Sequence, residues 1–324
     1  MVGNLLLDIN LSDLIEKNIG RKELDERLDE GIERKVIPGE QWFRKPENWY
    51  AMTSYSNPFK TPYTELSVLI ENSKKLKKHL NKTTKVFYGI GTGDTEIVPL
   101  LWDIKEHGYT EVVVIDAIKD FIDTFIQSLR NLRYESRETQ IMFRGYNTLF
   151  EQLTKDDFLF HNSQCKKVTH ICLGNTIGNF NQNEIFSIFA KNMKTNDLLL
   201  LGVQLNTNPD CLLNQYADNF AFEKLLKESI GRRIMGSRKL VWKYNRSNDS
   251  VEAWMGDLLI FRSKKYDIKK LSEFAGKFGL LPLESLTDGR VGVCLFKKNS
   301  LTERAGAKNP GVVDCGKVGR LYRG

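Results

Sequence analysis

KVFYGIGTGD, residues 85–94, is the stretch from which the fold is most directly inferred. An apolar run precedes three glycines at alternate positions, Gly89, Gly91 and Gly93. Glycine allows a tight turn and a close approach of the backbone to a ligand, and this turn opens an expected helix with free N–H groups. The pattern predicts a nucleotide-cofactor site or, as the alternative, a purely structural turn between a strand and a helix.

Downstream of this turn, short apolar runs alternate with amphipathic segments. We expect strands over residues 85–90, 111–116, 140–145, 168–174 and 197–205, helices over 94–107, 117–132 and 183–193, and a helical stretch near 149–158. Continuous apolar strands that alternate with helices predict a parallel sheet covered on both faces. Near the C-terminus, LLPLESL and VGVCLFKK flank Asp288-Gly289, which is a strong hairpin signal. Five parallel strands followed by an antiparallel hairpin give the Rossmann-like α/β sheet of class I methyltransferases.

The expected methyltransferase core comprises residues 64–205, beginning with a helix over 64–80, and residues 266–298. Residues 1–63 and an insertion at 206–265 differ in texture and are expected to form a small α+β substrate lobe. Within the lobe we expect helices over 1–35 and 211–230, a structured loop over 36–63, and strands over 239–244 and 250–261. Residues 299–324 lose all periodicity and are expected to be a loosely ordered tail.

The composition indicates an ordinary globular protein, with 41% hydrophobic and 27% charged residues among 324. The longest uncharged apolar run, residues 198–203, is too short to cross a bilayer, and the N-terminus lacks a secretory pattern. Five scattered cysteines argue against a disulfide framework, and the four histidines have no metal-ligand spacing. We therefore expect a cytoplasmic protein without a bound metal or a membrane span.

The net charge of +7 raises the question of nucleic-acid binding. The densest basic cluster consists of Lys74, Lys75, Lys77, Lys78, Lys82 and Lys85. It lies at the end of an expected helix, where cations favour the helix dipole, and it lacks interleaved aromatic residues for base stacking. A small-molecule partner is therefore expected instead of nucleic acid.

Asp116 ends the second expected strand, 25 residues after Gly91. A carboxylate at this place can accept hydrogen bonds from both hydroxyls of an adenosine ribose, in NAD and in S-adenosylmethionine alike. The C-terminal hairpin favours S-adenosylmethionine, because dinucleotide folds continue with parallel strands. The alternative is that Asp116 merely caps the following helix.

The fourth expected strand leads into LGNTIGNF, residues 173–180, at the end of the sheet where ligands bind. Asn175 and Asn179 each offer a donor and an acceptor, which suits an amine, a carboxylate or an amide. For either asparagine taken alone, the capping of a turn is an equally good interpretation.

LGNTIGNF and the following LLLLGVQLNTNPDCLLNQYADNFAFEKLL, residues 198–226, resemble the histidine-specific, S-adenosylmethionine-dependent methyltransferases of the ergothioneine pathway. The resemblance is close over residues 168–225 and loose over 50–298. It implies that Asn179 holds the amino-acid group of the substrate and that Tyr216 binds its carboxylate; we expect these two as catalytic residues. The residues expected to bind the cofactor are Tyr88, Gly89, Gly91, Gly93, Asp116, Ala117, Tyr146, Asn147, Asn175 and Thr176.

The chain departs from the family pattern at several positions. The segment GDTEIV lacks a lysine expected after the glycine turn, and the adenine-binding acid is missing before Tyr146. In the segment LLIFRSKKY, Ser263 matches a family serine, whereas Phe261 stands where a glutamate would read the histidine imidazole. A phenylalanine cannot accept that proton. If the alignment is displaced here, Glu252 or Asp257 would supply the carboxylate.

These patterns predict an S-adenosylmethionine-dependent N-methyltransferase that acts on a small amino-acid-like amine other than histidine. The expected substrate-binding residues are Tyr55, Phe59, Asn179, Tyr216, Phe261 and Ser263. The alternatives are transfer of the aminocarboxypropyl arm of the same cofactor, and a degenerate, non-catalytic partner protein.

Overall fold

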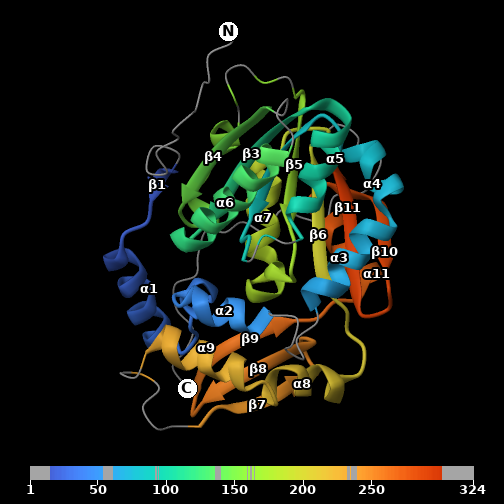
Figure 1. Cartoon of the computed structure of the whole chain (residues 1–324). Helices are drawn as coiled ribbons and strands as arrows, with labels where there is room; N and C mark the ends of the chain where they lie inside the picture. The colour runs from blue at the N-terminus through green and yellow to red at the C-terminus, as the bar shows by residue number, and fades with distance from the viewer. Residues whose placement is uncertain are drawn as a thin grey trace.

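Over its described residues the structure, a computed structural model, has an eight-stranded sheet and a three-stranded sheet, whose arrangement is drawn in Figure 1. It describes residues 15–53, 61–91, 93, 95–135, 140–158, 160, 163, 165–231, 234 and 239–300. The expected substrate-binding residues Tyr55 and Phe59 and all but the first two residues of the expected tail lie outside these ranges. Among the described residues, no helix combines the length and apolar character that a membrane crossing requires.

Five strands of the large sheet run parallel in the order β4-β3-β2-β5-β6. They are β2 (Thr83–Tyr88), β3 (Tyr109–Asp116), β4 (Gln140–Asn147), β5 (Lys167–Cys172) and β6 (Leu198–Gln204). Every residue of β2 and β6 is buried. The continuous apolar runs form these strands because both faces of the sheet are covered.

The sheet ends in the antiparallel hairpin of β10 (Leu280–Thr287) and β11 (Val291–Lys298), and β11 pairs with β6. At the turn, Asp288 Oδ1 accepts the backbone N–H groups of Arg290 and Val291 at 2.9 Å each. The strand order β4-β3-β2-β5-β6-β11-β10 confirms the expected class I methyltransferase sheet.

Helices cover the two faces of the sheet and bury one apolar cluster on each. On one face lie α7 (Gln182–Asn192) and α11 (Ile268–Gly276); on the other lie α3 (Thr61–Glu71), α4 (Ser73–Leu80), α5 (Ile97–His107) and α6 (Lys119–Glu135). The single helix expected over 64–80 is broken at Asn72, whose side chain bonds the carbonyl of Val68 at 2.9 Å. The stretch near 149–158 forms two short 3₁₀ turns, η3 (Phe150–Gln152) and η4 (Lys155–Phe158).

The N-terminal segment differs from the expected helix and loop. Residues Ile15–Asn18 form β1, which pairs in parallel with the free edge of β4, and of the described residues 15–35 only Arg21–Glu33 is helical, as α1. Pairing with an open sheet edge satisfies backbone groups that a helix would otherwise satisfy internally. The expected loop contains η2 (Gly39–Phe43) and a helix, α2 (Pro46–Thr53), because proline is favoured at the first helical position.

The described part of the insertion includes the helices α8 (Pro209–Ala217) and α9 (Phe220–Ile230) and the sheet of β7 (Val241–Asn245), β8 (Ser250–Met255) and β9 (Leu258–Lys264). The strand expected over 250–261 is two strands, because Gly256 turns the chain at φ +64°. The N-terminal residues Leu28 and Trp42 share one apolar core with Leu212 and Phe222 of the insertion. Helix α2 lies between this small sheet and the large one (Figure 1).

Candidate active site

A cavity lies at the carboxyl ends of the parallel strands, where α1, η2 and α2 cover them. Its walls come from the glycine turn after β2, the ends of β3 and β4, the loop after β5, and the N-terminal segment. The lining residues are Arg27, Gly39, Glu40, Phe43, Trp49, Pro62, Gly89, Ile90, Gly91, Thr95, Glu96, Asp116, Ala117, Ile118, Phe121, Thr148, Leu149, Phe150, Glu151, Leu173, Gly174, Thr176, Asn179 and Phe180.

The glycine turn has no room for side chains. Gly89 and Gly91 have φ values of +67° and +52°, in the left-handed region that glycine favours. A Cβ atom at Gly89 would lie 2.9 Å from Cγ2 of Thr176, and one at Gly91 would lie 2.9 Å from Nε1 of Trp49. The turn therefore presents bare backbone to the cavity.

Asp116 ends β3 and lines the cavity. Its carboxylate accepts the backbone N–H of Ile118 at 2.8 Å and of Ile90 at 3.1 Å. Asp116 therefore caps the segment that follows β3 and also faces the cavity. Burial raises the pKa of this carboxyl group to about 7, although the backbone N–H groups of Ile118, Ile90 and Gly91 oppose the rise. No cation among the described residues compensates the charge. Hydrogen-bond donors of a ligand would compensate the charge of this carboxylate.

The remaining walls are largely apolar. Ala117, Ile118, Leu149 and Phe150 follow β3 and β4 and offer flat apolar surface, while Phe43, Trp49, Phe121 and Phe180 add aromatic rings. Most of these residues were missed in the sequence because nothing distinguishes them from core residues there. Glu96 also lines the cavity, two positions beyond the GTGD turn, and Thr95 Oγ1 donates to it at 2.9 Å.

Asn179 is the last residue of the 3₁₀ turn η5 (Thr176–Asn179) and lines the cavity beside Gly39. Its side chain makes no hydrogen bond to another described residue. Asn175, by contrast, is buried and fully used: its Oδ1 accepts the N–H of Gln204 at 2.9 Å, and its Nδ2 donates to Ser263 Oγ and to the Lys264 carbonyl at 3.1 Å each. Of the two asparagines, Asn179 is the one available to a ligand.

The structure brings six of the expected site residues to the cavity: Gly89, Gly91, Asp116, Ala117, Thr176 and Asn179. Outside its lining lie Tyr88, Gly93, Tyr146, Asn147, Asn175, Tyr216, Phe261 and Ser263. Tyr88, for example, is the last residue of β2 and is buried within the apolar cluster beneath α7 and α11, with its hydroxyl 2.8 Å from Nδ1 of His170. Tyr146 donates to the carbonyl of Asp157 at 2.9 Å, and Asn147 to the carbonyl of Asp116 at 3.0 Å.

Tyr216 belongs to a buried polar cluster around Lys265. Lys265 Nζ donates to Gln204 Oε1 at 2.6 Å and to the hydroxyls of Tyr216 and Ser263 at 2.8 Å each. Burial lowers the pKa of Lys265 well below its usual value and raises that of Tyr216. The Tyr216 hydroxyl also donates to Gln204 Oε1 at 3.0 Å, so protein groups already occupy it.

Phe261 lies in an aromatic cluster. Its ring centroid is 4.6 Å from that of Trp42, 4.8 Å from that of Phe222 and 5.6 Å from that of Tyr216. Trp42 also approaches Gly39, where a Cβ atom would lie 3.8 Å from its Cζ3. Trp42 therefore packs against Phe261 and also lies near a residue of the cavity wall.

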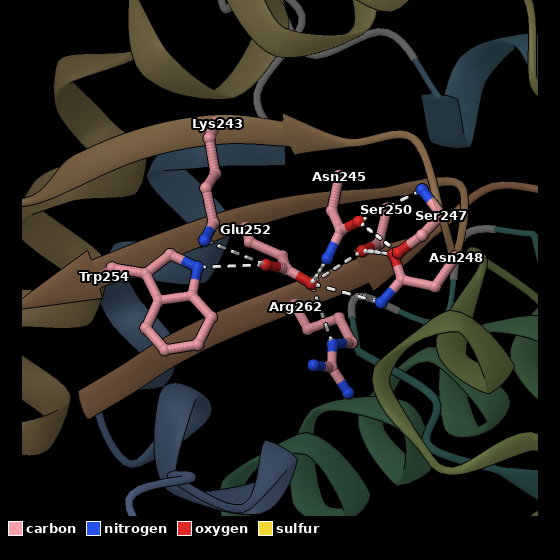
Figure 2. Close-up of polar contacts among 8 residues, drawn as sticks. All are labelled: Lys243, Asn245, Ser247, Asn248, Ser250, Glu252, Trp254 and Arg262. Carbon is pink, nitrogen blue, oxygen red and sulfur yellow. Dashed lines mark hydrogen bonds and ion pairs between the residues drawn. The ribbon is translucent and has the colours of Figure 1, made fainter. Parts of the chain in front are cut away.

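Glu252 and Asp257, the alternative carboxylates, also lie outside the cavity lining. Glu252 pairs across the small sheet with Arg262, on the face opposite to Ala253 and its partner Phe261. Figure 2 shows the side chains that converge on Glu252; they include Trp254 Nε1 at 2.9 Å and Ser250 Oγ at 2.9 Å. Burial tends to raise the pKa of Glu252, but these donors and Arg262 together hold it below its usual value. Asp257 pairs with Lys35 at the surface.

The lysines of the basic cluster do not form one surface. Lys85 is fully buried and pairs with Asp103. Lys77 pairs with Glu106 at 3.1 Å, and Lys78 with Glu284 at 2.9 Å. Much of the local charge is therefore balanced within the protein.

The residues present fit S-adenosylmethionine. A buried carboxylate without a described cation, Asp116, suits the ribose hydroxyls, and the bare turn at Gly89 and Gly91 suits close approach of the cofactor's amino-acid part. The apolar surface at Leu149 and Phe150 suits an adenine ring, and Glu96 suits an ammonium group.

The sheet order and this cavity define a class I, S-adenosylmethionine-dependent methyltransferase. More particularly, the chain belongs to the family described as histidine-specific methyltransferase, SAM-dependent, whose model matches residues 41–229. No curated protein sequence matches the chain.

Solved structures of distant methyltransferases are similar in arrangement. The 1,6-didemethyltoxoflavin-N1-methyltransferase of Burkholderia thailandensis, with bound 1,6-didemethyltoxoflavin and S-adenosylhomocysteine, is 10% identical over 74% of this chain and 81% of its own, with a TM-score of 0.40. The CcbJ methyltransferase of Streptomyces caelestis is 12% identical over 74% and 90%, with a TM-score of 0.43. The N-methyltransferase NodS of Bradyrhizobium japonicum is 9% identical over 79% and 100%, with a TM-score of 0.41.

Proposed function

We propose that this methyltransferase transfers a methyl group to the nitrogen of a small, amino-acid-like amine, and that free histidine is not its substrate. The observation that carries the proposal is the side chain of Asn179, which lines the cavity and has no hydrogen bond to another described residue. An amide with a free donor and a free acceptor can hold an amine with its lone pair in a fixed direction.

The cofactor would be held by the bare backbone of Gly89 and Gly91, by Asp116 at its ribose, and by the surface of Leu149 and Phe150 at its adenine. When bound, S-adenosylmethionine supplies an electrophilic methyl group on a sulfonium. The chain's own residues then have to position the amine, because in-line displacement depends mainly on distance and alignment. The aromatic walls formed by Phe43 and Phe180 would exclude water and favour the neutral amine, which is the nucleophilic form.

Two features support the exclusion of histidine. The family resemblance would place a glutamate at the position of Phe261, and the ring of Phe261 packs against Trp42 and not into the cavity. An imidazole in the cavity would leave its N–H without that acceptor, at a cost of about 1–3 kcal/mol. The carboxylate of Glu252 does not compensate, because it lies on the opposite face of the small sheet.

We further propose that residues 1–63 and 206–265 act together as a substrate lobe on a core of residues 64–205 and 266–298. Support comes from the apolar core that Leu28 and Trp42 share with Leu212 and Phe222. The lobe also contributes Gly39, which lies beside Asn179 at the cavity wall.

The proposal is tested by incubating the enzyme and a metabolite extract with methyl-labelled S-adenosylmethionine and finding the labelled product by mass spectrometry. S-adenosylhomocysteine should accumulate in step with an N-methylated amine. Methylthioadenosine in its place would indicate aminocarboxypropyl transfer, and bound but unconsumed cofactor would indicate a non-catalytic protein. Asn179→Ala should abolish labelling, whereas Asn183→Ala, an exposed position on α7, should not.

A further inference from the structure

Three charged side chains from separate elements meet in the wall of the cavity. Arg27 of α1 pairs with Glu40 of η2, with Nε 2.6 Å from Oε1, and with Glu151 of η3, with Nη1 3.2 Å from Oε1. All three residues line the cavity. Burial tends to lower the pKa of Arg27, but the carboxylates of Glu40, Glu151 and Glu30 outweigh it, so the guanidinium stays charged.

Arg27 is the one basic side chain among the lining residues that the structure describes. The other ionisable lining residues are acids: Glu40, Glu96, Asp116 and Glu151. Among these described lining residues, Arg27 is therefore the one cation to which an acceptor with a carboxylate group can bind. Tyr216, which the family resemblance assigned to that carboxylate, lies outside the lining and bonds Lys265 and Gln204.

The two carboxylates that hold Arg27 differ in exposure. The side chain of Glu40 is 8% exposed, so its charge-assisted bond fixes the guanidinium in place. The side chain of Glu151 is 46% exposed, and a pair this open to water contributes little and can separate. Nη2 of Arg27 makes no hydrogen bond to another described residue, and the Arg27 side chain is 32% exposed.

We propose that Arg27 binds the carboxylate of the methyl acceptor, and that this carboxylate replaces Glu151 when the acceptor enters. One carboxylate exchanges for another, so the charge around Arg27 is conserved while Glu151 turns to water. Gly39 lies beside Asn179, whose amide is expected to hold the amine, and the next residue in η2 is Glu40, which fixes Arg27. The turn η2 therefore connects the amine-binding residue with the carboxylate-binding residue. The inference rests on the proposed function and names the group by which the acceptor is recognised.

The experiment uses α-amino acids paired with the amines that their decarboxylation leaves, such as tryptophan with tryptamine and tyrosine with tyramine. Binding to the full-length enzyme is measured by calorimetry with S-adenosylhomocysteine present, and methyl transfer is measured separately with labelled cofactor. At least one amino acid should bind more tightly than its amine. Arg27→Gln should weaken binding of that amino acid about ten- to a hundredfold and leave the amine and S-adenosylhomocysteine unaffected.

A matched control is Arg44→Gln. Arg44 also ties the segment around η2 to α1, through Asp25 at 2.6 Å, but it does not line the cavity. If Arg27 only fastens these elements together, the two variants should lose thermal stability to a similar extent and neither should distinguish amino acid from amine. That result would overturn the inference.

The variant Glu151→Gln distinguishes the two roles by the direction in which affinity changes. Because Glu151 competes with the ligand for Arg27, its loss should tighten binding of the amino acid several-fold. A cavity that recognises cationic amines through its acids would respond in the opposite way, with weaker binding after the same substitution. Failure of every amino acid to bind also overturns the inference. Binding that depends on Arg27 without any methyl transfer would uphold Arg27 as the carboxylate-binding residue and refute the proposed function.

Discussion

The indole of Trp42 lies against the ring of Phe261, with centroids 4.6 Å apart and planes inclined by 56°. Both side chains are almost completely buried. In this arrangement the position at which the family resemblance would place a carboxylate for the histidine imidazole is part of an aromatic core. Phe261 therefore does more than leave this position without an acceptor, because the aromatic side chains around it also fill the space.

Restoring the acid at this position should not create a histidine methyltransferase. Phe261→Glu would place a carboxylate among Trp42, Phe222 and Tyr216, where it lacks a partner, and we expect a loss of about 3–5 kcal/mol in the free energy of unfolding. Histidine turnover should stay at background in the wild type and in the variant. Phe261→Leu, which keeps the site apolar, should cost less. Denaturant unfolding measures the stability loss, and steady-state methylation of histidine measures turnover. Efficient histidine turnover by the wild type would refute the argument.

The parallel strands were predictable from the sequence because their environment is uniform. β2 and β6 are buried along their whole length, so their apolar runs show where they lie to within two residues. β1 could not be predicted, because its charged sequence IEKN has no strand pattern and only the open edge of β4 makes it a strand. Pairing between distant segments decided the outcome there.

Only part of the candidate site could likewise be predicted from the sequence. Gly89, Gly91 and Asp116 lie at strand ends, where backbone conformation restricts which residues can occur. No sequence pattern singles out Arg27 and Glu151, since charged residues are common on a surface helix or a short turn. They become a site only when α1 and η3 meet at the cavity.

Affinity for S-adenosylmethionine should rise with pH between about 6 and 8. Burial raises the pKa of Asp116 to about 7, and ribose hydroxyls that donate to the carboxylate favour its ionised form. Binding should therefore release a proton, which calorimetry detects as a dependence on the ionisation heat of the buffer. Asp116→Asn should weaken binding by about 1–3 kcal/mol at pH 8 and abolish the proton release. Equal wild-type affinity at pH 6 and pH 8 would contradict this role.

Gly202→Ala should strongly destabilise the fold. A Cβ atom on Gly202 would lie 1.6 Å from Oε1 of Glu65, inside the buried carboxyl group that α3 places against β6. We expect a loss of at least about 1–3 kcal/mol in the free energy of unfolding, whereas Gly276→Ala, where a Cβ meets nothing within 4 Å, should be neutral or slightly stabilising. In a Glu65→Ala background the substitution at Gly202 should cost less. An equal cost in both backgrounds would show that the contact is not responsible.

The carboxyl group of Glu65 should make stability fall as the pH rises towards 8. Burial raises its pKa to about 8; the N–H of Gly174 opposes the rise, and nearby Glu96 adds to it. The folded state therefore holds a proton that the unfolded chain releases above its usual pKa of 4.5, so the free energy of unfolding decreases between about pH 5 and pH 8. Glu65→Gln mimics the neutral form, and its stability relative to the wild type should increase over the same range, by at most about 1.4 kcal/mol per pH unit, and then level off. Glu71→Gln, at an exposed position of the same helix, should show no such trend. Denaturant titrations at pH 5, 6.5 and 8 measure the difference, and a Glu65→Gln curve parallel to that of the wild type would mean that Glu65 is ionised in the folded protein at pH 5.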